Sequence, residues 1–430
     1  SITKRLLHYH IYMLSLFLAK RFFKGNKHVA EQHKASPPAL RIAMAGIAVG
    51  VAVMIISVCL VRGFQREVSG KLSGFAAHIE VVDDNFFGSP ETNPLYIDDA
   101  TIQAVGKAPG VVKVQRMSQK IGLFKTYDNF AGVALKGVGE DYDLSFLKQY
   151  MVKGVMPQFS SKRASNEIVI SQTLADKLNL HVGDKVFSYY FSQTIKQRRF
   201  KVVGIYNTYL KQFDNTYAIT DLYTVNQLNS WLLGQCSGLE VKLQSFDYLH
   251  PAVSYLSKHI GGKIDRYGHT FSIWGIDRNP YTASTLSWIN LLDTNVMVIL
   301  IIMICVAGFT MVSGLLILIL ERTNTIGVLK ALGASNSRIR HTFLWYASFI
   351  VVRGMVWGNV LGLGLILIQQ YFHIIHLDPN VYYVTSAPVE INWLWIVGIN
   401  VVTLVIDVLA LIIPSYLVSK IQPAKAIQFD

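Results

Sequence analysis

Charged residues are scarce in this chain of 430 residues. Asp, Glu, Lys and Arg make up 16% of the sequence, whereas hydrophobic residues make up 51%. Soluble globular proteins carry about 25% charged residues, and disordered chains contain few large apolar side chains, so the composition fits neither class. Because the apolar residues are gathered in a few long runs, the sequence indicates a membrane protein that carries a polar domain.

Cysteine is nearly absent as well. The three cysteines, Cys59, Cys236 and Cys305, lie far apart, and two of them fall inside apolar runs. This number and spacing exclude a disulfide framework and a cysteine-based metal cluster. We therefore expect all three to act as small apolar residues, and we expect no metal site in the chain.

Nucleotide-binding and catalytic motifs are missing too. The sequence contains no G-x-x-x-x-G-K-[ST] phosphate loop, no H-E-x-x-H and no C-x-x-C. Residues 234–238, Gly-Gln-Cys-Ser-Gly, have the spacing of a nucleophile elbow. An elbow needs a strand before it and a helix after it, and here the predicted order is the reverse. We therefore expect that the chain is not an enzyme and binds no cofactor itself.

Four apolar runs are long enough to cross a membrane, which takes about 20 residues for a hydrocarbon core of about 30 Å. The runs 42–61 and 294–320 contain no charged residue, and the other two are interrupted only by Arg353 and Asp407. The first 41 residues contain eight Lys or Arg against one acidic residue, and residues 321–340 contain four against one. Both segments are therefore expected in the cytoplasm by the positive-inside rule.

The predicted organisation follows from these spans and their orientation. It comprises a cytoplasmic or interfacial amphipathic helix within 1–40, transmembrane helices at 41–62, 286–320, 342–372 and 391–419, a large external domain at 63–285, a cytoplasmic connection at 321–341, an external loop at 373–390 and a cytoplasmic tail at 420–430. A disordered basic arm is the alternative for the N-terminal segment. The net charge of +13 is explained by Lys and Arg that flank apolar runs, so we expect anionic lipid and no nucleic acid as the partner.

The external domain mixes the periodicities of strands and helices. Alternating segments predict strands at 78–82, 121–126, 131–137, 167–170, 185–191, 200–206, 239–243 and 271–276, with helices at 173–180, 221–231 and 248–260. We therefore predict an α+β domain in two lobes. No helix breaker occurs between Pro280 and the end of the second span. A single helix from about 281 to about 322 is predicted there, a rod of roughly 60 Å at 1.5 Å per residue.

The cytoplasmic connection contains a short predicted helix. Ile326, Leu329 and Leu332 follow one another at i, i+3 and i+6, and Gly333 is a typical helix stop. We interpret these three side chains as one exposed apolar stripe, which on a basic cytoplasmic helix forms a docking surface for another protein. The alternative is that the stripe lies on the inner leaflet of the membrane.

Two further patterns concern the membrane helices. Arg353 and Asp407 each lie about 11 residues, or about 16 Å, from the predicted cytoplasmic end of their span. Because an unpaired charge at this depth is costly, we predict a structural ion pair between them. Glycines recur at intervals of four residues, which predicts close helix packing at Gly46, Gly50, Gly354, Gly358 and Gly362.

Residues 321–335 read Glu-Arg-Thr-Asn-Thr-Ile-Gly-Val-Leu-Lys-Ala-Leu-Gly-Ala-Ser. This run resembles the E-R-x-x-x-I-G-x-L-K-A-L-G-A-S signature of the FtsX/MacB-type ABC transporter permeases. The resemblance implies an α-helical membrane protein with four transmembrane helices and an α+β domain of the MacB-like periplasmic core type. It also implies a multi-pass protein of the inner membrane of a Gram-negative cell, with the large domain in the periplasm.

Several other stretches resemble the lipoprotein-releasing LolC/LolE branch of this superfamily: residues 46–54, 62–67, 78–81, 388–390 and 423–426. In that branch a dimer of permeases and two copies of a separate ATPase extract lipoproteins and hand them to a periplasmic carrier. The predicted hairpin 188–199 is short for the loop with which LolC-type subunits recruit the carrier, and 210–222 is closer to the LolE-type pattern. Whether the dimer is homomeric or heteromeric stays open.

The resemblance also implies roles for particular residues. The cytoplasmic helix would couple to the ATPase, with Glu321, Arg322 and Lys330 as polar contacts around the apolar stripe. ATP and Mg²⁺ would be bound by the ATPase, whose hydrolysis would move the periplasmic domain by mechanotransmission. A cavity for lipoprotein acyl chains is implied between the first and second spans of the two facing permeases, with the candidates Val51, Met54, Ile55, Val58, Phe64, Met297 and Leu300.

Two other functions remain open at this point. A MacB-like permease would work with an adaptor and an outer-membrane channel in a tripartite efflux system, and fusion to an ATPase domain would favour it. An FtsX-like transmembrane signaller would activate a cell-wall hydrolase and move no substrate. Such a regulator needs no acyl-chain cavity, so crosslinking to acylated protein distinguishes it from a lipoprotein transporter.

Overall fold

The computed structural model describes residues 38–89, 92–191, 194–232 and 234–416. The predicted amphipathic helix and the cytoplasmic tail therefore lie outside the described residues. The chain divides into two compact units. Of the described residues, the membrane unit contains those up to Phe64, Leu291–His376 and those from Ala387, and the sheet unit contains those within Gln65–Asn290 and Leu377–Ser386.

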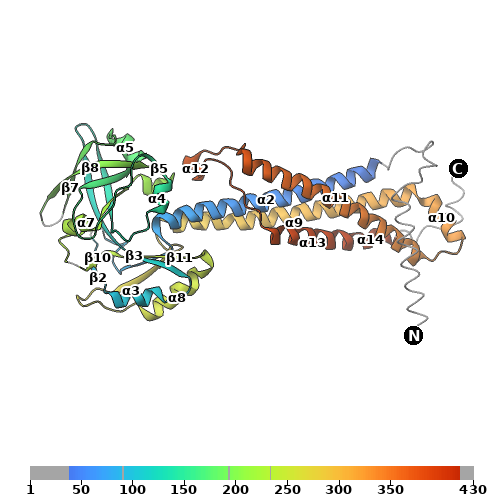
Figure 1. Cartoon of the computed structure of the whole chain (residues 1–430). Helices are drawn as coiled ribbons and strands as arrows, with labels where there is room; N and C mark the ends of the chain where they lie inside the picture. Colours follow the sequence, from blue (N-terminus) through green and yellow to red (C-terminus); the bar gives the residue numbers. More distant parts are fainter. Residues whose placement is uncertain (1–37, 90–91, 192–193, 233, 417–430) are drawn as a thin grey trace. The chain divides into compact units, whose positions relative to one another are not determined.

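Among the described residues, four helices are long and apolar enough to cross a membrane, as predicted. They are α2 (Pro38–Ala76), α9 (Ala283–Glu321), α11 (Asn336–Phe372) and the stretch formed by α13 (Trp393–Ala410) and α14 (Ile412–Ser415). The short helix α10 (Thr323–Ala331) connects α9 to α11 (Figure 1). Two helices, α2 and α9, are longer than the predicted spans and supply residues to both units. No proline occurs within α9 or within α2 after its first residue, so nothing in the sequence ends either helix at the expected membrane boundary.

The helix α13 is shorter than predicted. It ends at Ala410, and a separate short turn of helix contains Pro414. A proline has no backbone N–H and its ring clashes with the carbonyl four residues earlier, which here belongs to Ala410. The prediction of an unbroken span over 391–419 did not take this proline into account.

Glycines bring α11 close to α2 within the membrane unit. A Cβ atom added at Gly358 would lie 2.7 Å from the carbonyl oxygen of Ala48, and one added at Gly354 would lie 3.1 Å from the side chain of Ile47. On α2, a Cβ added at Gly46 would lie 3.0 Å from Thr310 of α9. These glycines therefore lie at helix contacts where a larger side chain would force the helices apart.

The sheet unit is built on one ten-stranded mixed sheet, in the order β12-β1-β11-β3-β4-β9-β6-β8-β5, with β7 paired to β3 and β8. Its strands are β1 (Ile79–Asp83), β3 (Val111–Lys125), β4 (Phe130–Val138), β5 (Met151–Gly154), β6 (Glu167–Ser171), β7 (Lys185–Tyr190), β8 (Lys196–Tyr206), β9 (Tyr217–Asp221), β11 (Gly238–Leu243) and β12 (Phe271–Gly275), while β2 (Leu95–Tyr96) and β10 (Gln235–Cys236) form a separate pair.

Helices accompany this sheet in the α+β arrangement that was predicted: α3 (Asp99–Gly106), α4 (Ser145–Gln149), α5 (Gln172–Leu178), α6 (Lys211–Asp214), α7 (Leu222–Asn229), α8 (Leu249–His259) and, in the segment Leu377–Ser386, α12 (Pro379–Tyr382). The expected division into two lobes stays a prediction, and a single mixed sheet runs through the whole unit. The long strand β3 pairs with β11 through its first half and with β4 and β7 through its second half, so one strand belongs to both halves of the sheet.

Candidate functional site

The helix α10 lies where the sequence signature predicts a coupling helix. It ends at Ala331, and Gly333 follows with φ +87°, a left-handed conformation that glycine adopts without strain. Ser335 stands at the N-cap position of α11 with extended backbone. The predicted helix and its stop signal are therefore both present.

The expected exposed stripe on α10 is wrong in its composition. Ile326 is fully buried, Leu329 packs partly against the core of the membrane unit, and Leu332 is 79% exposed. Six residues of an α-helix turn through about 600°, which leaves Leu332 about 120° away from Ile326. The outward apolar residues are Val328, 47% exposed, and Leu332, which share one face at i and i+4.

Polar residues surround this outward face of α10. Glu321 and Arg322 are exposed at its beginning, and Lys330 is half-buried near its end. With its inner side anchored by Ile326 and its outer side apolar, α10 can be held by its own chain and still offer a surface to a second protein.

The predicted ion pair between Arg353 and Asp407 is wrong. The carboxylate of Asp407 is fully buried, and neither of its oxygens has a hydrogen-bond partner among the described residues, whereas the side chain of Arg353 lies on an exposed face of α11. The predicted pairing assumed straight helices of equal depth. Because α13 ends at Ala410, counting from Val418 misplaced Asp407.

A different polar contact joins α11 to α13. The side-chain amides of Asn359 and Asn400 exchange two hydrogen bonds, with Nδ2 to Oδ1 distances of 2.6 and 2.9 Å. Each amide also donates to the carbonyl four residues earlier in its own helix. Polar pairs of this kind stabilise helix association in membranes. An asparagine in each of two apolar runs was the signal available in the sequence, and it was missed.

We expect that Asp407→Leu stabilises the protein by about 1–3 kcal/mol, because it removes a buried carboxyl group without a described partner. The shift in the thermal unfolding midpoint of the full-length protein in lipid nanodiscs measures this effect. Asp407→Asn is the matched control, since it keeps the shape and a buried polar group, and a small change is expected. A large loss of stability in both variants would show that Asp407 binds a group beyond the described residues.

The candidates for an acyl-chain cavity fall into two groups. Four residues on α2 are buried inside the membrane unit: Val51, Met54, Ile55 and Val58. The helix α11 covers this side of α2, where a Cβ added at Gly358 would lie 2.8 Å from Val51. These four side chains therefore pack within their own chain and present no free surface, which corrects the expectation. Phe64 and Leu300 are half-buried, and Met297 is 54% exposed.

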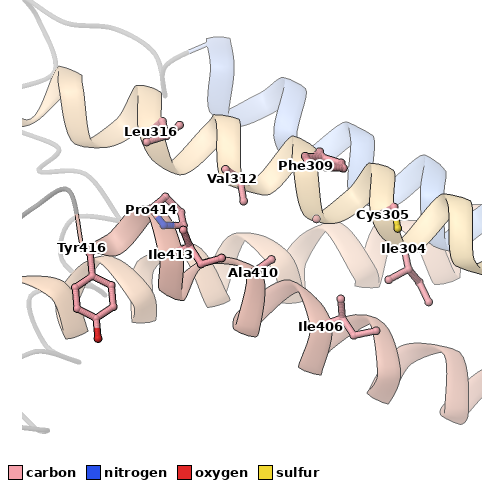
Figure 2. Close-up of a pocket in the computed structure, with 11 residues that line it drawn as sticks. Ile304, Cys305, Phe309, Val312, Leu316, Ile406, Ala410, Ile413, Pro414 and Tyr416 are labelled. Atoms are coloured by element: carbon pink, nitrogen blue, oxygen red, sulfur yellow. The ribbon is translucent and has the colours of Figure 1, made fainter.

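A pocket of about 690 Å³ lies elsewhere in the membrane unit, between α9 and the α13–α14 stretch. Figure 2 shows side chains of α9, among them Phe309 and Leu316, on one side of the pocket, and Ile406 of α13 and Ile413 of α14 on the other, with Tyr416 just after α14. The lining is almost entirely apolar, and the pocket lies where α13 ends and Pro414 follows. Sequence periodicity did not indicate it, because it depends on this break in the fourth span.

Two of the segments that resemble the LolC/LolE branch, 62–67 and 388–390, contact each other in the membrane unit. Gly63 of α2 lies against the backbone of Pro388 and Val389, and the backbone N–H of Glu390 donates to the carbonyl of Cys59 at 3.0 Å. Nearby, the guanidinium of Arg62 lies 3.7 Å from the carboxylate of Asp293 on α9 and 4.9 Å from the ring of Trp395 on α13. This cluster joins α2, α9 and α13.

Replacing Gly63 by alanine should destabilise the protein by about 1–3 kcal/mol, because the new Cβ would lie 2.5 Å from the carbonyl oxygen of Pro388. Gly70→Ala is the control in the same helix, where a Cβ has no neighbour within 4 Å. Alanine there should be neutral or stabilising by up to about 1 kcal/mol. Unfolding midpoints in nanodiscs compare the two, and equal effects would contradict the close contact at Gly63.

A buried polar cluster lies in the sheet unit beside the end of α2. The ammonium of Lys136 on β4 lies 2.6 Å from the carboxylate of Glu240 on β11 and donates to the carbonyl of Phe75 at 2.7 Å. Glu80 on β1 stands directly opposite Glu240 and accepts a hydrogen bond of 3.1 Å from the amide of Asn279. The cluster therefore connects the end of α2, the sheet and the segment that precedes α9.

A second buried cation holds the segment between α11 and α13. The ammonium of Lys71 on α2 donates to the carbonyl of Tyr383 at 2.7 Å and lies over the rings of Tyr150 and Tyr209, at 4.9 and 5.4 Å. The residues of both clusters are far apart in the sequence, so sequence patterns could not bring them together.

The connection between β7 and β8 is short, as expected for the predicted hairpin 188–199. Five residues, 191–195, join the two strands. Lys125 on β3 is paired with Phe187 on β7, which is paired with Arg199 on β8. All three side chains are exposed, so they lie side by side on the same face of the sheet. These strands thus carry an exposed basic and aromatic face without a long loop at their end.

Two family models match the chain. The MacB-like periplasmic core domain matches residues 41–248, and the FtsX-like permease C-terminal domain matches residues 297–423. Among solved structures, the periplasmic region of MacB from Actinobacillus actinomycetemcomitans covers 46% of this chain and 87% of its own, with 14% identity and a TM-score of 0.31.

Curated relatives match along most of the chain. The lipoprotein-releasing system transmembrane protein LolC of Xylella fastidiosa is 23% identical over 90% of this chain and 92% of its own length. LolE of Haemophilus influenzae is 24% identical over 89% and 92%. The macrolide export ATP-binding/permease protein MacB of Neisseria meningitidis is 24% identical over 90% of this chain and 58% of its own length.

The identities to LolC and to LolE are nearly equal, so the preference for a LolE-type subunit stays a prediction. The broader assignment does not depend on that distinction. A membrane unit of four long apolar helices, a mixed-sheet domain between the first two, and two matching family models in this order agree with one another. The chain belongs to the FtsX/MacB-type ABC transporter permeases and is similar to their lipoprotein-releasing LolC and LolE members.

Proposed function

We propose that this chain is the permease subunit of an ABC transporter that extracts lipoproteins from the inner membrane and releases them to a periplasmic carrier. A separate cytoplasmic ATPase dimer binds ATP and Mg²⁺ and supplies the energy, and a second permease, identical or different, completes the transporter. The similarity to LolC and LolE over about nine-tenths of the chain supports this assignment.

The observation that carries the proposal is the two-sided character of α10. Its inner residue Ile326 is buried in the membrane unit, and its outer residues Val328 and Leu332 are exposed between charged neighbours. A protein docked on the outer side therefore acts on a helix that its own chain holds firmly. Movement of α10 passes directly to α9, which supplies residues to both units. This is the proposed route of mechanotransmission to the periplasmic domain.

The exposed face of α9 is the surface we propose for the acyl chains. Met297 lies on it, whereas the α2 residues named for this role are buried. An apolar helix face toward a second permease would hold acyl chains by burial of apolar surface alone. The short β7–β8 hairpin favours a subunit that leaves carrier recruitment to its partner permease.

Copurification with its partner ATPase tests the proposal, followed by identification of the lipids and acylated proteins that remain bound. We expect a stable complex with bound lipoprotein. A photoreactive residue at Met297 should crosslink to acylated protein, with the buried position Met54 as the matched control. If the ATPase complex formed but crosslinked no acylated protein, the FtsX-like signaller would be favoured. If a macrolide stimulated ATP hydrolysis, MacB-like efflux would be favoured.

A further inference from the structure

The buried cluster of the sheet unit contains more acid than base. Glu80 and Glu240 are directly opposite each other on the antiparallel strands β1 and β11, and their side chains are almost completely buried. Among the described residues, Lys136 is the cation bound to Glu240, with its ammonium 2.6 Å from the carboxylate. Like charges directly opposite on paired strands repel each other, and a buried charge without a partner is expensive. Two ionised carboxylates with one ammonium are therefore unfavourable here.

The hydrogen bonds indicate which carboxyl group is ionised. Glu240 receives the ammonium of Lys136 and also the hydroxyl of Tyr142, so it has two donors, one of them charged. Glu80 receives only the neutral amide of Asn279 among the described residues. Charge-assisted hydrogen bonds favour the ionised form of their acceptor. The negative charge therefore belongs to Glu240 and the proton to Glu80.

The cluster also occupies a particular position in the unit. Lys136 binds the carbonyl of Phe75, in the last turn of α2. The side chain of Asn279 binds Glu80. The backbone carbonyl of Asn279 accepts a hydrogen bond of 2.9 Å from the backbone N–H of Ala283, the first residue of α9. The end of α2 and the beginning of α9 are thus held by one cluster. Its five side chains are those of Lys136, Glu240, Tyr142, Glu80 and Asn279.

We propose that this cluster holds one proton at neutral pH, on Glu80, and that the proton keeps the end of α2 and the beginning of α9 fastened to the sheet. The proposal does not depend on what the protein transports. Release of the proton would place a second carboxylate beside Glu240, where the part of the chain that the structure describes supplies one bound cation, Lys136. The other titratable groups that face Glu80 are Glu240, Lys136, Tyr142, Tyr217 and Tyr281.

The expected pH dependence follows from the direction of the shift. Burial, followed by the charge of Glu240, raises the pKa of Glu80 from 4.5 to about 8. Between these values the folded protein binds more protons than the unfolded chain. The contribution of Glu80 to stability is therefore fully present below about pH 4.5 and is lost as the pH rises through about 8.

The test compares the full-length protein with Glu80→Gln in nanodiscs at about pH 6 and about pH 9. Glutamine mimics the protonated carboxyl group, so the variant should lose the pH dependence assigned to Glu80, whereas the unmodified protein should unfold roughly 5 °C or more lower at the higher pH. Asp128→Asn, at an exposed carboxylate in the β3–β4 turn, should leave the pH dependence unchanged.

Infrared spectroscopy gives a second readout, which is made first on the unmodified protein. The unmodified protein should show a protonated-carboxyl band at neutral pH with a component that is lost near pH 8, and Glu80→Gln should remove this component. Absence of this band at neutral pH would overturn the proposal. The same pH dependence of unfolding in Glu80→Gln and in the unmodified protein would also overturn it.

Discussion

Replacing Lys136 by methionine is expected to destabilise the protein by about 3–5 kcal/mol, the range for removing one partner of a buried ion pair. The substitution leaves the carboxylate of Glu240 buried without a cation, and it leaves the carbonyl of Phe75 without its donor. For a unit of this size the loss corresponds to a decrease in the unfolding midpoint of roughly 6–20 °C. Thermal unfolding of the full-length protein in nanodiscs measures it.

Two controls separate the ion pair from other effects of the substitution. Lys242→Met removes a cation that lies 2.8 Å from Asp143 on the same sheet, where both side chains are partly exposed to solvent. Exposed pairs contribute about 1 kcal/mol or less, so a small change is expected. Adding Glu240→Gln to Lys136→Met should restore most of the lost stability, because no buried charge is left unpaired. Equal losses for Lys136→Met and Lys242→Met would contradict the account of the cluster.

A single aspartate on the outer face of α10 is expected to weaken binding of the ATPase by roughly 30-fold or more, the equivalent of about 2 kcal/mol at an interface hot spot. Val328→Asp and Leu332→Asp each place a charge at an apolar position that is exposed in this chain. Because neither side chain is buried, both variants should fold normally. Affinity of the detergent-solubilised permease for the ATPase, measured by surface-immobilised binding, gives the result.

Variants elsewhere distinguish docking from general damage. Leu232→Asp adds the same charge at a 60% exposed position in the sheet unit and should leave ATPase binding unchanged. Ile326→Ala removes a buried side chain from the inner side of α10, so it should reduce stability by about 2–5 kcal/mol. If Val328→Asp and Leu332→Asp bound the ATPase as well as the unmodified chain does, α10 would not be the coupling surface.

Much of the fold was predictable because it depends on local patterns. The absence of a breaker after Pro280 predicted α9 from about 281, and the structure begins this helix at Ala283. Alternating apolar residues predicted β1, β6 and β11 within one or two residues. Each of these elements follows from periodicity along a single segment, which a sequence shows directly.

The errors came from geometry that local patterns do not contain. The apolar stripe on α10 was predicted from the spacing i, i+3 and i+6. Residues i and i+6 lie about 120° apart around a helix, so the prediction placed the buried Ile326 and the exposed Leu332 on one face by mistake. The depth of Asp407 was counted through Pro414, which ends α13 early. The partnership of Lys136 with Glu240 depends on the order of strands in the sheet, and no spacing along the chain reveals that order.

We propose that ATP hydrolysis on the cytoplasmic side drives lipoprotein release through this chain. The most direct measurement uses proteoliposomes that contain the permease, its ATPase and a labelled lipoprotein, with a soluble periplasmic carrier outside. We predict that the labelled lipoprotein appears in the soluble fraction only when ATP is hydrolysed, and that Leu332→Asp abolishes this release. ATP hydrolysis stimulated by the permease while the lipoprotein stays in the membrane would contradict the account.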